Sequence, residues 1–334
     1  MEATSTSNAT STLNATSTAN ERQMQNYQFE FSGRGSEYFA IVIVNWLLTL
    51  ITLGIYYPWA RAKRLKYIYG QTILNNERFN FAGTGKEMFR GFIKVILFYI
   101  IVVAIYLLSA YMQVILFGVL FLLVASIAIF PLAIHGSFRY RMSRTSYRGI
   151  RFGYRGDRAK LFKDYIKWSL LTIVTLGIYS AWMQMNVRRY THQNIRYGNV
   201  EFKNDSNGVD WFVLNLIGYL FTLVTLGIYS FWWQRDMFNY YINNISMQKD
   251  GQKIKCRSTA TGGGFFKLLI GNLFLVVFTL GFGKAWADMR TQRFIWNNVK
   301  IEGDINLDEI RQTEEEYTDA FGEDLADLFE IDLA

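Results

Sequence analysis

Three asparagines lie within apolar stretches of the 334-residue chain, at Asn45, Asn215 and Asn272. Asn45 and Asn272 each precede by seven residues the threonine of a recurring Thr-Leu-Gly sequence. In lipid, an amide side chain finds a hydrogen-bond partner on a neighbouring helix or borders a polar passage. We therefore expect these residues either to join helices or to line a pathway.

Residue types that support catalysis or metal binding are few. The chain has two histidines, His135 and His192, and one cysteine, Cys256. Neither histidine stands in a recognisable arrangement with a nucleophile and a carboxylate. A single cysteine cannot form an intrachain disulfide, and these few ligands argue against a metal site. We expect no catalytic residues, no metal and no cofactor. We therefore predict that the chain is not an enzyme.

The strongest pattern is a five-residue motif that recurs along the chain. Thr-Leu-Gly-Ile-Tyr occupies 52–56, 175–179 and 225–229, and Thr-Leu-Gly-Phe-Gly occupies 279–283. After each threonine, a tryptophan follows at the seventh residue and another aromatic at the fifteenth. The motif residues are Gly54, Trp59, Gly177, Trp182, Gly227, Trp232, Gly281 and Trp286. These constant offsets predict an internal repeat.

A fifth, degraded copy results when Pro131 is aligned with Pro58. It contains 23 more residues between its Gly-x-Gly turn and its proline than the first copy does. That surplus corresponds to about one membrane-spanning helix. The chain is therefore predicted to have five repeats, one of them with an additional helix.

Six apolar stretches separate the polar segments. Two of them have uninterrupted cores, 168–182 and 268–283, that reach only about 23 Å against a hydrocarbon thickness of about 30 Å, although lysines at their ends can extend them. The stretches are 38–60, 92–110, 113–134, 165–183, 209–233 and 264–287. Six short segments of alternating polarity predict strands between them, and they begin at Tyr27, Arg78, Gly149, Asn199, Lys253 and Asn298. The predicted fold is an all-α integral membrane protein of about six transmembrane helices built from five repeats, with short β-strands between helices.

Each Thr-Leu-Gly motif lies at the end of an apolar stretch. Its glycine permits a bend there, and its aromatic residues suit the membrane interface. A basic segment follows, for example 59–71, and we expect it to bind anionic lipid headgroups at the membrane surface. Arginine and tyrosine interleaved in this way would suggest nucleic acid in a soluble protein, but beside membrane helices we expect no nucleic acid. A protein partner or oligomer is not determined.

Charge divides the chain into three parts. Residues 1–26 are rich in serine and threonine and are expected to be disordered. The repeat-built membrane domain is 27–301, and residues 1–301 hold 34 Lys and Arg against 14 Asp and Glu. The tail, 302–334, holds 13 acidic residues and a single Arg311. Within it, 320–333 matches an acidic amphipathic helix, predicted either to dock on a basic protein surface or to remain solvated.

The sequence allows two membrane topologies, which differ in the side on which the termini and the strands lie. Six spans, counted with the positive-inside rule, place both termini outside the cytoplasm. Alternatively, short helices enter the membrane and return at each Thr-Leu-Gly bend. All strands would then lie on the cytoplasmic side, where they could pair into a sheet.

The repeated Thr-Leu-Gly-Ile-Tyr-x-x-Trp, with Arg-Phe-x-Phe-x-Gly-x-Gly between helices, resembles the YjgN family of bacterial inner-membrane proteins over about 27–301. This is a family of unknown function, so the resemblance implies a multi-pass inner-membrane location and supplies no catalytic residues. We expect a multi-pass inner-membrane protein that transports a small solute or lipid. The alternative is a membrane-organising or adaptor protein that binds anionic lipid and a partner.

Overall fold

The computed structural model describes residues 26–303 and 307–314. The predicted disordered segment therefore lies almost entirely outside the described residues, as does the predicted acidic helix at 320–333.

Ten short antiparallel strands close into a barrel. Each strand pairs with the strands before and after it in the chain, and β1 pairs with β10. The strands are β1 (Asn26–Phe31), β2 (Thr72–Leu74), β3 (Glu77–Phe81), β4 (Thr145–Tyr147), β5 (Ile150–Tyr154), β6 (Ile195–Tyr197), β7 (Val200–Asn204), β8 (Ile245–Lys249), β9 (Gln252–Ser258) and β10 (Val299–Glu302). Because side chains alternate across each strand, apolar residues gather inside the barrel while charged residues face outward.

The barrel interior is filled by side chains. Phe79 stacks on Tyr147 with 4.7 Å between ring centroids, and Phe152 stacks on Tyr197 at 4.6 Å. Aliphatic side chains such as Ile254 complete the cluster. The barrel is therefore a packed core, as small barrels usually are.

Helical hairpins connect alternate pairs of strands. They are α2 (Gly35–Ile51) with α3 (Tyr57–Gln71), α4 (Gly85–Tyr111) with α5 (Ile115–Ser143), α6 (Arg158–Val174) with α7 (Ser180–Gln193), α8 (Gly208–Val224) with α9 (Ser230–Asn243), and α10 (Gly262–Phe278) with α11 (Lys284–Asn297). The other connections between successive strands are tight turns. Because neighbouring strands are antiparallel, all five hairpins leave the same end of the barrel, here called the helical end. The tight turns lie at the opposite, turn end.

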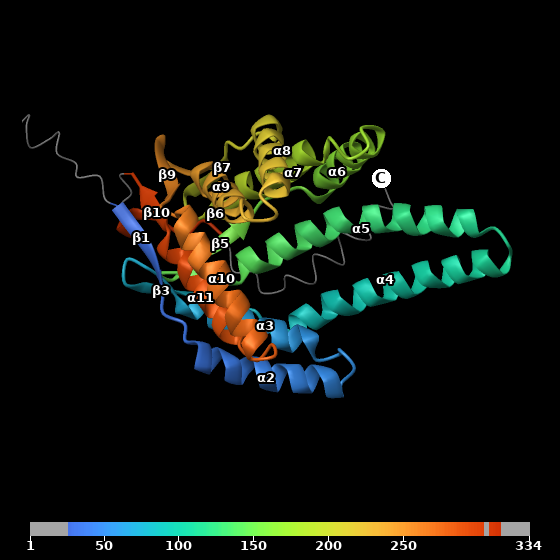
Figure 1. Cartoon of the computed structure of the whole chain (residues 1–334), viewed down its shortest axis with the longest axis horizontal. Helices are drawn as coiled ribbons and strands as arrows, with labels where there is room; N and C mark the ends of the chain where they lie inside the picture. The colour runs from blue at the N-terminus through green and yellow to red at the C-terminus, as the bar shows by residue number, and fades with distance from the viewer. Residues whose placement is uncertain (1–25, 304–306, 315–334) are drawn as a thin grey trace, which may run out of the picture.

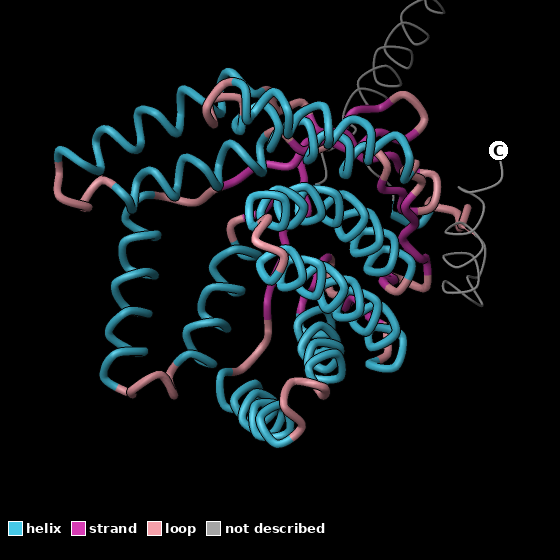
Figure 2. Tube along the Cα trace, turned by 90° about the vertical axis from the view of Figure 1, so that its right-hand side faces the viewer, coloured by secondary structure: helices cyan, strands magenta, loops and turns pink. Residues whose placement is uncertain are grey.

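The ten helices form a closed ring. Within each hairpin the two helices pack together, and the second helix of each hairpin contacts the first helix of the next. The contact of α11 with α2 closes the ring. The α4–α5 hairpin projects far beyond the others (Figure 1), and the hairpins spread in different directions around the strands (Figure 2).

The predicted all-α fold with six transmembrane helices is wrong. Each helical hairpin begins and ends on adjacent strands of one closed barrel, so the chain must return to the side from which it left. Among the described residues, only α4 and α5 are long and apolar enough to cross a membrane. The stretches 38–60, 209–233 and 264–287 each contain a helix, a reversal and the start of a second helix.

Six of the ten strands coincide with the alternating segments found in the sequence, and four were missed. The missed strands are β2, β4, β6 and β8, and the first three of these have three residues each. Such a length is too short for a period-two pattern. The turn pairs Asn75-Asn76 and Asp250-Gly251, which have positive φ angles, are the signals that could have located two of them.

A C-terminal strap, defined as residues 307–314, packs on the barrel and includes the 3₁₀ turn η1 (Leu307–Glu309). Leu307 and Ile310 are buried in the same cluster as the barrel interior. The Glu309 carboxylate pairs with Lys249 Nζ at 2.9 Å. The first part of the predicted acidic tail therefore belongs to the folded body.

Candidate functional site: the helical ring and its apolar tips

The four short hairpins reverse direction at their Thr-Leu-Gly sequences in the same manner. In the first, the Gly54 N–H donates to Thr49 O at 2.7 Å and the Leu53 N–H donates to Leu50 O at 3.1 Å. This is a Schellman motif, which ends a helix with one residue in the left-handed region. The Thr52 hydroxyl accepts a hydrogen bond from the Tyr56 N–H at 3.0 Å and so fixes the start of the next helix.

The left-handed residue of this motif is a leucine in every short hairpin. The leucines are Leu53, Leu176, Leu226 and Leu280, with φ between 50° and 52°. Glycine is the usual residue here, since a Cβ costs about 1–2 kcal/mol in this conformation. These leucine side chains are 90–94% exposed, so packing within the chain does not explain them.

Other exposed apolar side chains surround each leucine. In the first hairpin they are Ile51 and Ile55. The corresponding residues are Val174 and Ile178, Val224 and Ile228, and Phe278 and Phe282. Removing one such side chain from water contributes about 1.5–3 kcal/mol, which outweighs the backbone cost. Clusters of this kind indicate a surface that contacts an apolar medium.

The motif tryptophans lie between hairpins. Trp59 on α3 packs so closely on Gly85, the first residue of α4, that a Cβ there would overlap the indole ring. The same holds for Trp182 with Gly208, Trp232 with Gly262, and Trp286 with Gly35. The last pair joins α11 to α2. The motif tryptophans, for which the sequence predicts a place at the membrane interface, thus join hairpins of the ring.

In three of the four short hairpins, the aromatic residue fifteen positions after the threonine is a tyrosine whose hydroxyl joins the two helices. The Tyr190 hydroxyl accepts from the Asp157 N–H at 2.8 Å and donates to Asp157 O at 2.6 Å. Tyr240 makes the same pair of bonds to Asn207. Because these partners cap the first helix, the tyrosine ties the second helix to the start of the first. The spacing was visible in the sequence, but the role of the hydroxyl was not.

The three asparagines do not come together. Asn272 on α10 donates to Thr291 Oγ1 at 3.0 Å and to Ala287 O at 3.3 Å, and so joins α10 to α11. Asn215 donates within its own helix, to Trp211 O at 2.7 Å. Asn45 is buried in α2, and its Oδ1 has no hydrogen-bond partner. Interhelical bonding is therefore seen at Asn272 alone among the three.

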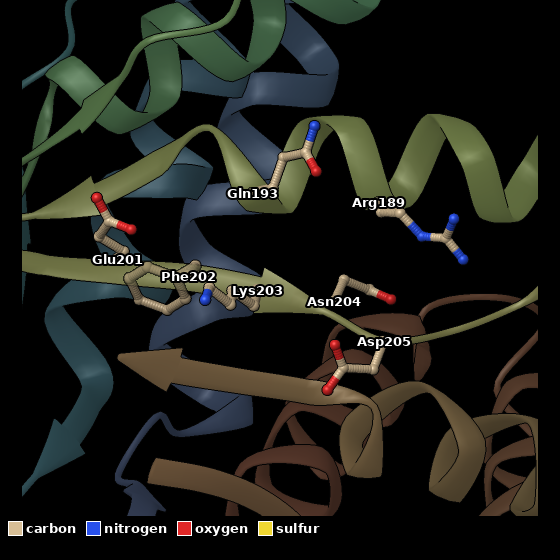
Figure 3. A pocket seen from close by; sticks show the side chains of 7 residues that line it. All are labelled: Arg189, Gln193, Glu201, Phe202, Lys203, Asn204 and Asp205. Atoms are coloured by element: carbon tan, nitrogen blue, oxygen red, sulfur yellow. The ribbon is translucent and has the colours of Figure 1, made fainter. Parts of the chain in front are cut away.

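A cleft of about 430 Å³ lies on the outer wall of the barrel, between α7 and β7 (Figure 3). Arg189, Gln193, Glu201, Phe202, Lys203, Asn204 and Asp205 line it. Its charged groups bond to one another or to neighbours: Asp205 pairs with Lys253 at 2.8 Å and Arg189 donates to Ser206 O at 2.5 Å. These bonds join the segment that follows β7 to α7 and to β9, so the polar groups of the cleft have a structural role.

The histidines and the cysteine are buried or half-buried. His192 Nδ1 lies 2.7 Å from Arg188 O, and burial lowers the pKa of its ring. Burial raises the pKa of the Cys256 thiol to about 12, so it stays protonated inside the barrel. Over residues 26–303 and 307–314, no three His, Cys, Asp or Glu side chains gather as metal ligands would.

Comparison with known proteins gives a family. The profile described as "Bacterial protein of unknown function (DUF898)" matches residues 26–213 and 233–328. "Inner membrane protein YjgN" of Salmonella typhimurium is 36% identical over 157 residues, which are 46% of this chain and 38% of that protein. The protein of the same name from Escherichia coli K12 is 34% identical over 134 residues, 40% of this chain and 32% of that protein.

The chain thus aligns with about a third of the length of these curated relatives. No solved structure matches it. The family profile covers most of the barrel, the helical ring and the strap, including three of the four Thr-Leu-Gly tips. The chain therefore belongs to the family of bacterial proteins of unknown function DUF898.

Proposed function

We propose that this protein is a non-enzymatic, membrane-organising protein of the bacterial inner membrane, which inserts its helical ring into one leaflet and binds anionic headgroups. One observation carries the proposal. All five hairpins leave the same end of a filled, closed barrel, and four of them end in exposed apolar tips. The names of the relatives support the location.

The depth of insertion follows from helix length and charge. The first helix of each short hairpin has 17 residues, or about 25 Å, and does not span a hydrocarbon core of about 30 Å. The second helices carry cations, for example Arg61, Lys63 and Lys66 on α3. The apolar helices α2, α8 and α10, the C-terminal half of α6 and the tips would lie among acyl chains of one leaflet. The second helices and the lysine-bearing first half of α6 would lie at headgroup level. The longer α4 and α5 would cross the membrane and return.

The charge distribution supports a cytoplasmic barrel. In this arrangement, the only part of residues 26–303 and 307–314 that reaches the far side is the α4–α5 reversal, near Tyr111–Val114, which has no charged residue. The Lys and Arg residues of the barrel and the helices then remain on one side. The positive-inside rule assigns that side to the cytoplasm.

Transport of a small solute or lipid, the other expected function, has no such support among the described residues. The barrel interior is packed, the asparagines are separate, and the cleft of 430 Å³ lies on the outer wall. We therefore favour the membrane-organising function. We also propose that the protein binds a protein partner, without assigning a surface to it.

Single cysteines in a Cys256→Ser background test the topology. Glu77→Cys and Glu201→Cys lie on exposed barrel strands, and a charged maleimide should label both from the cytoplasmic side of membrane vesicles. Met112→Cys, at the α4–α5 reversal, should react from the opposite side. Six spans would place residues 77 and 201 on opposite sides. Labelling of these two from different sides would overturn the proposal.

The tips provide the second part of the test. Leu176→Cys and Leu226→Cys should stay unlabelled by the charged reagent from either side and react once the membrane is dissolved. Lys255→Cys, on the outer face of β9, is the matched exposed control. Rapid labelling of both tips in intact membranes would show that the tips lie in water and would reject insertion.

A further inference from the structure

The path of the C-terminal strap directs the chain toward α6. Gln312 Oε1 accepts from the Arg151 N–H at 2.9 Å, and Glu314 Oε1 lies 2.8 Å from Arg155 Nη2. The strap therefore runs along β5 from the turn end toward the helical end. The Glu314 side chain is 6% exposed, and it packs so closely over Gly153 that no Cβ would fit there. The strap is thus anchored where it reaches the start of α6.

The residues that follow the strap are strongly acidic. Residues 315–334 contain eight Asp and Glu and no Lys, Arg or His. Twenty residues span up to about 65 Å when extended and about 30 Å as a helix. Either length is enough to cover a helix that begins a few residues beyond Arg155.

The nearest helix presents a row of cations. Lys160, Lys163 and Lys167 lie at i, i+3 and i+7 of α6 and so share one face, and all three are exposed. None of them makes an ion pair with a described carboxylate. Of the two carboxylates in 155–167, Asp157 caps the helix by accepting from the Lys160 N–H at 3.0 Å. We call Lys160, Lys163 and Lys167 the α6 cationic row.

We propose that residues 315–334 dock on the α6 cationic row, and that anionic lipid headgroups displace them. Opposite charge supplies the attraction, and the strap anchored at Glu314 holds the acidic segment at high local concentration. The docking stands independently of membrane insertion. The displacement rests on the proposed function, in which the helical end faces the headgroups.

Hydrogen exchange on the full-length protein in nonionic detergent tests the docking without a bilayer. At low salt, amides of 315–334 should exchange at least tenfold more slowly than in a random coil. Physiological or higher salt should reduce this protection, because exposed charge pairs are screened beyond about 8 Å. Random-coil exchange at low salt would overturn the proposal.

Two triple variants locate the surface. Lys160→Gln/Lys163→Gln/Lys167→Gln should abolish the protection, whereas Lys253→Gln/Lys255→Gln/Arg257→Gln, on the outer face of β9, should leave it unchanged. Equal protection in both variants would overturn the assignment to α6. In case the first variant does not fold, disulfide formation between Lys163→Cys and Asp327→Cys in the Cys256→Ser chain provides a separate reading. A failure of this pair to cross-link faster than Lys255→Cys with Asp327→Cys would contradict the docking.

Nanodiscs test the displacement. Protection of 315–334 should persist in phosphatidylcholine discs and fall at least tenfold in discs that contain 30% phosphatidylglycerol. Persistent protection in both would remove the competition with lipid while leaving the docking measured in detergent intact. A failed topology test, by contrast, would not change the result in detergent, so the two proposals can fail separately.

Discussion

At the residue scale, glycine occupies two kinds of position in the hairpins, each for a different physical reason. Gly54 and its counterparts adopt φ between 92° and 95°, a region that favours glycine. Gly85 and its counterparts begin helices, where alanine would ordinarily be preferred, and they are glycine because an indole lies against them. The first kind serves the reversal of a hairpin and the second serves the joint between hairpins.

The two glycines of α4 make a matched comparison. Gly85→Ala should lower the free energy of unfolding by about 1–3 kcal/mol, because the added methyl would overlap Trp59. Gly91→Ala, in the same helix with open space around it, should raise the free energy by about 0.5–1 kcal/mol. Denaturant unfolding in detergent would measure both. Equal stabilisation by the two changes would refute the joint.

At the element scale, three of the short hairpins combine an apolar first helix, α2, α8 or α10, with a more polar second helix. Tyrosine hydroxyls join the two helices near the barrel, as Tyr190 and Tyr240 show. In the last hairpin the equivalent aromatic is Phe294, which has no hydroxyl and packs against Phe265. The Asn272–Thr291 bond between α10 and α11 supplies a polar link in this hairpin.

A double-mutant cycle can measure that link. Asn272→Leu should lower the free energy of unfolding in detergent by about 0.5–2 kcal/mol, as buried interhelical amides do. Combined with Thr291→Val, the loss should be smaller than the sum of the two single losses, because both changes remove the same bond. Asn45→Leu is the comparison and should cost less, since among the described residues the Asn45 side chain makes no hydrogen bond to a neighbouring helix, whereas the Asn272 amide donates two. Full additivity of the pair would show that Asn272 does not act through Thr291.

At the scale of the whole molecule, the barrel positions the five hairpins and the strap covers part of it. Inside the barrel, the Tyr147 hydroxyl donates to Leu74 O at 2.7 Å and the Tyr197 hydroxyl donates to Tyr147 O at 2.9 Å. Burial raises the pKa of Tyr147 to about 12 and also raises that of Tyr197. The folded barrel therefore favours neutral phenols.

This preference predicts alkaline instability. The pKa of an unfolded tyrosine is about 10, so the contribution is fully present below pH 10. It should be lost as the pH rises from 10 toward 12, because the unfolded chain releases the proton first. Unfolding midpoints between pH 8 and pH 12 would measure the decline. Tyr147→Phe should show a shallower decline above pH 10 than the unchanged protein, and identical slopes would contradict this account.

The sequence by itself was sufficient for local features. The Thr-Leu-Gly motifs marked the reversals, because glycine readily adopts the positive φ that follows the leucine at the end of each first helix. The apolar stretches 92–110 and 113–134 correspond to the two long apolar helices, α4 and α5, whose length and composition suit a membrane span. The alternating segments indicated six strands, and the resemblance indicated the family, which the profile match confirms.

Only the tertiary structure decided how these features combine. A hydropathy window measures how many apolar residues follow one another. It does not detect a reversal of the chain inside an apolar stretch such as 209–233. Strand pairing joins residues far apart in the chain, as in the pairing of β1 with β10. Strands of three residues are too short for alternating polarity to predict them or their pairing. Closure of the barrel then requires every hairpin to return to the side it left. For that reason the predicted six spans are replaced by one barrel, four short hairpins and one hairpin long enough to cross the membrane.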